Sequence, residues 1–164
     1  MNSKIPSDAR TLRNALGCFA TGVTIITGKT PDGQLIGFTA NSFNSVSLDP
    51  PLVLFSLDRK AQSLRGFQMS THFAVNILAE DQQALSGRFA RATDDKFAGV
   101  AYSEWEGGCP ILDGSIASFE CRLRDMHAGG DHVIFVGQVE RMSAREDGKP
   151  LLYFRGAYAG LTKV

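Results

Sequence analysis

The apolar residues of this chain fall mainly in short runs and at alternating positions, a pattern typical of β-strands and not of long helices. The pattern predicts strands at residues 23–28, 35–39, 52–57, 73–78, 115–127 and 133–142. Turn sequences separate neighbouring runs, as in Pro31-Asp32-Gly33, so most strands are expected to join as antiparallel hairpins.

Helices are expected at only a few places. Ser7 and Asp8 can cap a first helix, because short polar side chains accept hydrogen bonds from the N–H groups of a first turn. Its apolar positions recur at helical spacing: Leu12, Ala15, Leu16 and Phe19. Other helical stretches are expected near 64–67, at 80–89 and near 95–97, the last within an irregular region, 91–110. The predicted fold is therefore mainly β with a few helices, arranged as an antiparallel barrel.

One polar stretch interrupts the strand pattern. After residues 37–39 small hydroxyl and amide side chains dominate, and Asp49-Pro50-Pro51 closes the stretch before the strand at 52–57. We expect a polar loop whose main-chain N–H groups lack ladder partners. Water, the loop's own Ser, Thr and Asn side chains, or a ligand can satisfy those groups, so a solvated turn and a binding loop are both open.

A second polar connection, at 58–63, leads into the helix near 64–67. Ser56, Arg59, Lys60 and Ser63 lie beside that helix start, where hydroxyls, main-chain donors and positive charge suit an anion. The alternative is a surface loop whose basic side chains are solvated.

Bulk properties narrow the class of protein. A length of 164 residues suits one domain over 1–164. A formal net charge of zero gives no support for binding to nucleic acid, which needs a basic face. No apolar run approaches the ~18 residues of a membrane helix, and the N-terminus lacks the apolar segment of a signal peptide. Cys18, Cys109 and Cys121 have no Cys-x-x-Cys spacing, so we expect packed, reduced cysteines in a cytoplasmic protein.

Several common catalytic motifs are missing from the sequence. It has no Gly-x-Gly-x-x-Gly after a strand, no phosphate-binding Walker loop and no Gly-x-Ser-x-Gly elbow. His127 and His132 flank a turn and could face one another across a hairpin as metal ligands, but no third ligand stands at a sensible spacing, so no metal is expected.

An ordered set of short motifs runs from about residue 10 to the C-terminus. It comprises 16–24 (LGCFATGVT), 39–43 (TANSF), 45–51 (SVSLDPP), 73–78 (FAVNIL), 130–132 (GDH), 137–139 (GQV) and 155–158 (RGAY). In this order the motifs resemble the short-chain flavin reductases, which are the NAD(P)H:flavin oxidoreductase components of two-component flavin-dependent monooxygenases. The resemblance implies an FMN-binding split barrel, usually a homodimer, that reduces FMN or FAD with NADH or NADPH and passes reduced flavin to a separate monooxygenase.

The resemblance also implies roles for single residues. Thr39, Ala40, Asn41 and Ser42 would lie along the flavin, with Ser45, Val46 and Ser47 at its ring edge and ribityl chain. Ser56, Arg59, Lys60 and Ser63 would hold its phosphate, and Arg88 and Phe89 are weaker candidates on the same ligand. His132 would meet the nicotinamide nucleotide, with Tyr158 close by; a turn residue that satisfies Asp131 is the alternative for His132.

Two other functions remain open from the sequence. One is a split-barrel protein that binds flavin but oxidises another substrate. The other is a flavin-binding module without turnover. The sequence does not decide between NADH and NADPH or between FMN and FAD, and the stretch 106–113 could form a lid, a dimer contact or neither.

Overall fold

The computed structural model describes residues 8–93 and 95–162. Its helices are α1 (Ala9–Leu16), α2 (Leu64–Met69), the 3-10 turn η1 (Glu80–Gln82) and α3 (Gln83–Phe89). Its strands are β1 (Thr21–Gly22), β2 (Thr24–Lys29), β3 (Leu35–Ala40), β4 (Asn44–Leu48), β5 (Pro51–Asp58), β6 (His72–Ile77), β7 (Tyr102–Glu104), β8 (Pro110–Leu112), β9 (Ala117–Gly129), β10 (His132–Ala144), β11 (Leu152–Phe154) and β12 (Ala157–Ala159). Every predicted strand is present, with ends that differ by a few residues.

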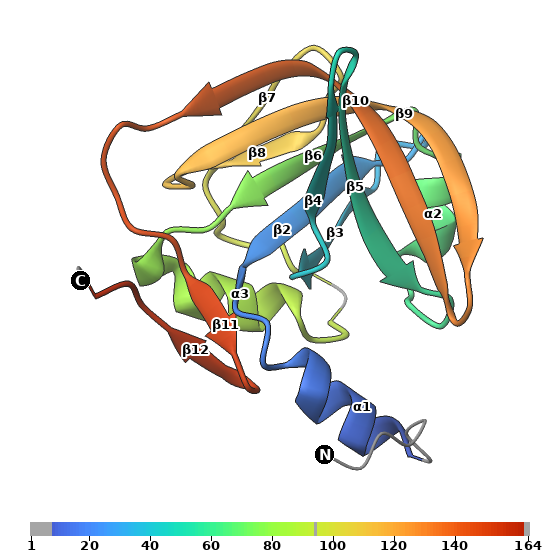
Figure 1. The fold of residues 1–164 in the computed structure, drawn as a ribbon. Coiled ribbons are helices and arrows are strands. Elements are labelled where there is room, and N and C mark those ends of the chain that lie inside the picture. The colour runs from blue at the N-terminus through green and yellow to red at the C-terminus, as the bar shows by residue number, and fades with distance from the viewer. Residues whose placement is uncertain (1–7, 94, 163–164) are drawn as a thin grey trace.

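The described strands include a seven-stranded antiparallel sheet in the order β3-β2-β6-β9-β10-β5-β4, which curls on itself (Figure 1). Hairpins join β2 to β3 and β9 to β10, as the turn sequences predicted. A further hairpin, which the sequence did not predict, joins β4 to β5. The fold is therefore the expected mainly β, antiparallel split barrel. Strands β1, β11 and β12 form a small separate sheet, and β7 pairs with β8.

Aromatic residues fill the centre of the barrel. Phe55 of β5 stacks on Phe135 of β10 with ring centroids 4.8 Å apart, and Phe73 of β6 meets Phe55 edge-on at 4.9 Å. Side chains alternate along β5, so the neighbours of Phe55 point the other way. Ser56 and Asp58 thereby face away from this core and are available to a surface site.

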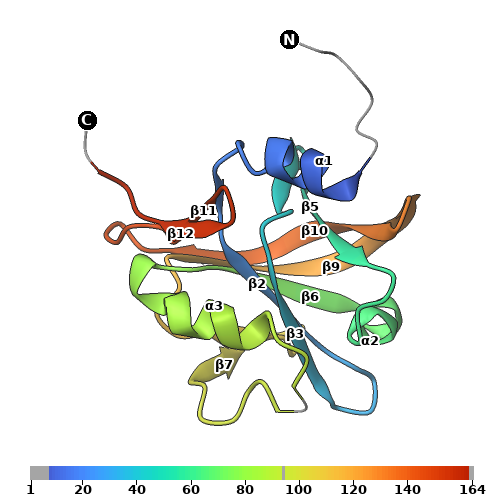
Figure 2. The same cartoon turned by 90° about the horizontal axis from the view of Figure 1, so that it is seen from below.

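Helix α1 forms as predicted, with Asp8 as its cap: the main-chain N–H of Thr11 donates to Asp8 Oδ1 at 2.7 Å. Its apolar side chains, however, do not pack on the barrel of the same chain, and Figure 2 shows the helix outside the curled sheet. Leu16 is 66% exposed and Phe19 is 77% exposed. Helical spacing correctly predicted an apolar side of the helix, but not what covers it.

The prediction of a loop over the polar stretch is wrong in part. Residues of β4 form an edge strand, with Ser45 opposite Val53 and Ser47 opposite Leu52. Of the polar stretch, residues 41–43 before β4 and the turn at 49–50 after it lie outside a strand. The strand escaped the pattern because most of its residues are exposed, so no alternation of apolar and polar residues marks it.

The prediction of a helical stretch near 95–97 is also wrong. Asp95 Oδ1 accepts a hydrogen bond from the N–H of Ala98 at 2.9 Å, and Gly99 has a φ of 68°, so the chain turns there and does not continue as a helix.

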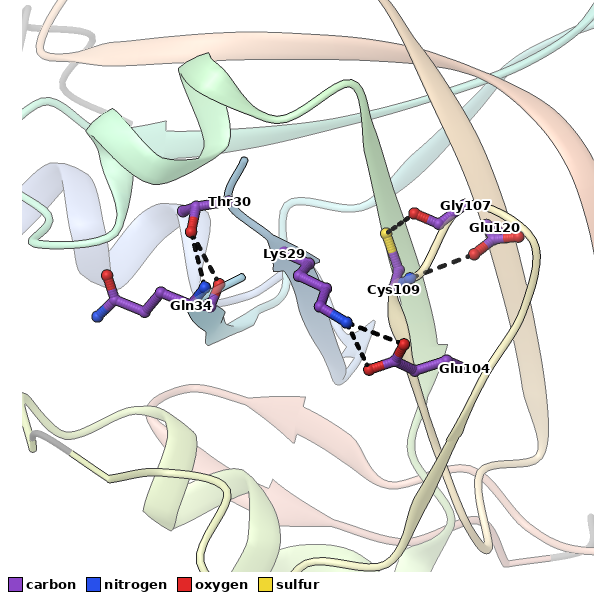
Figure 3. Close-up of polar contacts among 7 residues, drawn as sticks. All are labelled: Lys29, Thr30, Gln34, Glu104, Gly107, Cys109 and Glu120. Carbon is purple, nitrogen blue, oxygen red and sulfur yellow. Dashed lines mark hydrogen bonds and ion pairs between the residues drawn. The ribbon is translucent and has the colours of Figure 1, made fainter. Parts of the chain in front are cut away.

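The β7–β8 hairpin lies against the outer face of the barrel. Lys29 Nζ contacts both carboxylate oxygens of Glu104, at 3.1 and 3.0 Å (Figure 3). Thr27 Oγ1 donates to the carbonyl of Pro110 at 2.6 Å, and Asn76 Oδ1 accepts from the N–H of Leu112 at 2.9 Å. Thr27 and Asn76 are buried and the Lys29–Glu104 pair is exposed, so polar contacts both beneath and at the surface hold the hairpin against the barrel.

Two of the three cysteines pack as expected. Cys109 and Cys121 are buried, and burial raises the pKa of the Cys109 thiol to about 12. Cys18 follows α1 and is exposed, so the expectation of a packed side chain is wrong for this residue. Among residues 8–93 and 95–162, no helix is long and apolar enough to cross a membrane.

Candidate active site

A cleft of about 580 Å³ opens beside the ends of β3 and β5, and we call it the main cleft. Several residues singled out from the sequence line it: Thr39, Ala40, Asn41, Ser42, Ser56, Lys60, Ser63, Phe89 and His132. The fold thus brings together segments that are far apart in the sequence. In Figure 2, β3 runs between α3 and α2. The other walls of the cleft come from the end of α3 with the residues after it, and from the residues that lead into α2.

Two hydroxyl groups hold the wall formed by residues 39–42. Thr39 Oγ1 donates to the carbonyl of Ser86 in α3 at 2.6 Å. Ser42 Oγ donates to the carbonyl of Ser56 at 3.1 Å and accepts from its N–H at 3.0 Å. Both hydroxyls are therefore engaged within the protein, and they shape the cleft.

The main-chain N–H groups of the same wall, unlike its hydroxyls, are not all hydrogen-bonded within the protein. Within the described part of the chain, the N–H groups of Asn41, Ser42 and Phe43 have no acceptor. The pairing of β3 with β2 ends at Ala40, so the residues that follow it have no strand partner for their N–H groups. The sequence predicted such unpaired donors for the whole polar stretch. They can donate to the polar edge of a flat ligand.

Basic residues surround the cleft more than acidic ones. Lys60, Arg91 and Lys96 line it, against one acid, Asp58. Asp58 Oδ1 accepts from the N–H of Lys60 at 2.7 Å, which fixes the start of the connection to α2. The excess of positive charge suits a phosphate or another anion.

Arg59 occupies a different place from its neighbour Lys60. Its Nε donates to the carbonyl of Gly130 at 3.0 Å, and its N–H donates to the carbonyl of Asp131 at 2.9 Å. Arg59 does not line the main cleft. It ties the end of β5 to the β9–β10 turn, which carries His132.

His132 begins β10 and lies opposite Asp58 of β5. Its Nδ1 is 2.7 Å from Asp131 Oδ1, and this hydrogen bond, followed by the charge of the ring, lowers the pKa of Asp131. With Nδ1 donating to the carboxylate, Nε2 is the ring nitrogen left for a ligand. The arrangement fixes the ring at the mouth of the cleft.

Some residues named from the sequence lie elsewhere. Ser45, Val46 and Ser47 belong to the edge strand β4 and do not line the main cleft. Arg88 and Tyr158 line a separate hollow of about 710 Å³. The Tyr158 hydroxyl is 2.8 Å from Ser86 Oγ. Tyr158 also lines a small hollow of about 200 Å³ together with Thr39, Ala40 and Asn41, which belong to the wall of the main cleft.

Sequence reasoning missed Lys96. Its Nζ donates to the carbonyls of Gly37 at 3.1 Å and Phe89 at 3.0 Å, and burial lowers its pKa. Phe89 is fully buried and packs against the backbone of Gly37, so Lys96 reinforces a contact between β3 and α3. No motif marks this lysine, because its role comes from carbonyl groups that only the fold brings together.

The two histidines considered as metal ligands do not oppose each other. His127 pairs with Ile134 and His132 pairs with Gly129 across the hairpin. In the part of the chain that the structure describes, no group of three or more His, Cys, Asp or Glu residues could hold a metal ion.

Comparisons with known proteins agree with the resemblance. Residues 16–162 match the family described as the flavin reductase like domain. The chain is 45% identical to the flavin-dependent monooxygenase reductase subunit HsaB of Rhodococcus jostii, over 94% of this chain and 78% of that protein. It is 46% identical to the FMN reductase (NADH) SmoA of Agrobacterium fabrum, over 95% of this chain and 88% of that protein.

A solved structure gives the same result for the fold. The NADH:FAD oxidoreductase SgcE6 of Streptomyces globisporus, in complex with NAD and FAD fragments, superposes with a TM-score of 0.93 and 33% identity. The match covers 99% of this chain and 98% of that one. With its split-barrel topology, its ordered motifs and these relatives, the chain belongs to the flavin reductase-like family.

Proposed function

We propose that this chain is an NAD(P)H:flavin oxidoreductase that transfers hydride from NADH or NADPH to FMN or FAD and supplies the reduced flavin to a separate monooxygenase. The observation that carries the proposal is the main cleft in a chain of this family, with free main-chain donors at 41–43 on one wall and Lys60 and Ser63 on another. Relatives named as reductase subunits of flavin-dependent monooxygenases support the partner class.

The residues present fit a flavin nucleotide. Main-chain N–H groups at 41–43 would donate to the polar edge of the ring system, and the anchored hydroxyls of Thr39 and Ser42 would hold this wall in place. Lys60 and Ser63 would hold the phosphate by charge and hydrogen bonding. Bound flavin supplies the hydride acceptor, so the protein's task is to position two ligands and exclude water.

His132 would receive the nicotinamide nucleotide at the mouth of the cleft. Its ring is held by Asp131 and by the strand pairing of β10 with β5. Held this way through Nδ1, the ring leaves Nε2 for a hydrogen bond with the ligand. This role is one of positioning, because hydride transfer between two held rings needs no protein acid or base.

We also propose that the chain works as a homodimer in the cytoplasm. Leu16 and Phe19 of the α1 region and Leu48 at the β4–β5 tip are large, apolar and exposed, Leu48 by 93%, and a second copy is the occupant that would cover them. The free thiols of the three cysteines fit a reducing compartment. Light scattering after gel filtration would measure the dimer directly.

One assay tests the proposed activity. Purified protein is mixed with NADH and excess FMN or FAD in air, and the loss of the nicotinamide absorbance band is followed. Rapid NADH loss that requires both added flavin and protein is the expected result. A protein that binds flavin and turns yellow, yet leaves NADH intact, would instead be a flavin-binding module without turnover.

A further inference from the structure

The chain contains the dipeptide Asn-Ser at three places, residues 2–3, 41–42 and 44–45. An asparagine followed by a small residue is open to deamidation, because no bulky side chain keeps the next main-chain nitrogen away from the side-chain amide. The first dipeptide lies outside the described residues. The other two are only three residues apart, and the fold places them in different surroundings.

Asn41 lies where the chain leaves β3 and bends toward β4. It is exposed and lines both the main cleft and a hollow of about 1040 Å³ beside α1, so water reaches its amide. Within the described part of the chain, the N–H of the following residue, Ser42, has no acceptor. The nitrogen that would react is therefore free, and the amide that it would attack is accessible.

Asn44 is the closest comparison, and its main chain is held differently. It is also exposed and followed by a serine, but it begins β4 opposite Leu54 of β5, and Ser45 lies opposite Val53. Closing a ring between the side-chain amide and the next nitrogen needs a rotation of the main chain away from extended geometry. The pairing of β4 with β5 must open before Asn44 can react, and no such pairing holds Asn41.

Two further asparagines are protected by regular structure or burial. Asn14 lies within α1, where the helical main chain excludes the same rotation. Asn76 is fully buried, its Nδ2 donates to the carbonyl of Ile25 at 3.2 Å, and its Oδ1 accepts from the N–H of Leu112 at 2.9 Å. Among the asparagines that the structure describes, Asn41 alone combines exposure, an irregular main chain and a following N–H without an acceptor.

We propose that Asn41 is a site of spontaneous deamidation, with water as the only co-reactant. The main-chain nitrogen of Ser42 forms a bond to Cγ of Asn41, the Cγ–Nδ2 bond breaks, and the side-chain nitrogen leaves as ammonia with the proton of the Ser42 N–H. Water then opens the resulting succinimide at one of its two carbonyl carbons. Opening at Cγ gives aspartate, opening at the main-chain carbon gives isoaspartate, and neither step changes an oxidation state.

Either product places a new carboxylate on the wall of the main cleft. The consequence for flavin rests on the proposed function, because a carboxylate there would repel a ligand that carries phosphate. Isoaspartate also lengthens the main-chain path by one carbon and would displace the free N–H groups of Ser42 and Phe43. Protein kept without ligand should therefore lose flavin affinity with time, and bound flavin, by engaging the Ser42 N–H, should slow that loss.

The test follows both dipeptides in one sample. The full chain is incubated folded at mildly alkaline pH, and chymotrypsin, which cleaves after Phe43, places Asn41 and Asn44 in separate peptides. Mass spectrometry detects the gain of about 1 Da on deamidation. Asn41 should react at least about tenfold faster than Asn44 in the folded chain, because β4 must open first. In denaturant the two rates should become similar, and saturating FMN should slow the folded-state reaction at Asn41 only.

Three variants connect the modification with flavin binding, which fluorescence titration measures. Asn41→Gln keeps an amide but disfavours ring closure, so the mass gain at this position should disappear. Asn41→Asp reproduces one product and should raise the Kd for FMN about tenfold. Asn44→Asp adds the same charge on β4, outside the main cleft, and should bind FMN as the wild-type protein does. Thermal melts would show that the variants fold.

Equal rates at Asn41 and Asn44 in the folded chain would overturn the inference, as would no reaction at Asn41 under conditions that modify the unfolded protein. A fast reaction that FMN does not slow, with an Asn41→Asp variant that binds FMN normally, would keep the modification site and remove the contact assigned between this wall and the flavin. A wild-type protein that binds no flavin would remove the proposed function, and the folded-state rates would still decide the modification.

Discussion

The hydroxyl of Ser42 replaces a strand partner for Ser56. It accepts from the Ser56 N–H at 3.0 Å and donates to the Ser56 carbonyl at 3.1 Å, so one side chain completes both hydrogen bonds that the main chain of β5 lacks at this point. A segment without regular structure is thereby fixed to a core strand at the wall of the main cleft.

Replacing Ser42 tests this relationship. Ser42→Ala leaves the Ser56 main chain without partners and should reduce the free energy of unfolding by about 1–3 kcal/mol. Flavin affinity should fall as well, because the N–H groups at 41–43 lose their fixed position. Chemical denaturation and flavin titration measure the two effects. Ser143→Ala, at an exposed position of β10, is the control, and equal behaviour of the two variants would contradict the proposed role of Ser42.

Gly137 permits the closest packing in the barrel core. A Cβ at this position would overlap the ring of Phe73 and lie 2.9 Å from the Cβ of Cys121. Gly137→Ala should therefore lower stability by about 1–3 kcal/mol through overpacking. Combining it with Phe73→Leu should recover part of the loss.

Gly22→Ala is a suitable comparison for this change. A Cβ at Gly22 would meet nothing within 4 Å, so its melting temperature should stay near that of the wild-type protein. A Gly137→Ala protein as stable as Gly22→Ala would show that the core relaxes around the added methyl group.

The role of His132 can be separated from flavin binding. His132→Ala should raise the KM for NADH more than it raises the Kd for flavin, because His132 is assigned to the nicotinamide nucleotide. Steady-state kinetics at saturating flavin, together with flavin titrations, give both quantities. Equal losses in the two measurements would count against the assignment.

The Asp131–His132 contact predicts a pH dependence. Because the hydrogen bond from His132 lowers the pKa of Asp131 below its ordinary value of 3.8, the contact stabilises the folded protein above that pH. The contribution is lost as the pH falls through the lowered pKa of the folded state. Asp131→Asn should thus melt below the wild-type protein at neutral pH, and the difference should shrink in acid.

The size of this effect will be small, since Asp131 is exposed and solvent screens the contact. Asp125→Asn, also exposed on β9, provides a control for the simple loss of one negative charge. If both variants show the same pH profile, the contact with His132 is not the cause.

Thiol reactivity provides a further check on the fold. Burial raises the pKa of Cys121 as well as that of Cys109, and thiolates are the reactive form. A thiol reagent at mildly alkaline pH should therefore modify no more than one cysteine of the folded chain, namely Cys18. Unfolding in denaturant should expose all three, as counted by mass spectrometry.

The core strands could be predicted because burial leaves a period in the sequence. Phe55 and Phe73 stand in runs of apolar residues, and both lie in the barrel centre. Strand β4 left no such period, since both of its faces meet solvent over most of its length. The pattern of apolar residues therefore predicts strands that are buried on one face, and it does not reveal strands that are exposed on both faces.

The site shows the same limit. Small polar residues at 39–42 suggested a binding wall, and the fold places them along a cleft with Lys60 and His132. Lys96 could not be found this way, because its partners are the carbonyls of Gly37 and Phe89, which any residue type would supply. Contacts to the main chain leave no signature in the side chains of the partners.

The internal anchoring of Thr39 and Ser42 has a consequence for turnover. Because these side chains hold their segment through bonds to the protein itself, the departure of a product replaces ligand by water and leaves the surrounding backbone ordered. An enzyme that releases a reduced product and binds an oxidised substrate in each cycle gains from a rigid binding site, since no conformational entropy of the backbone is lost and regained at every exchange.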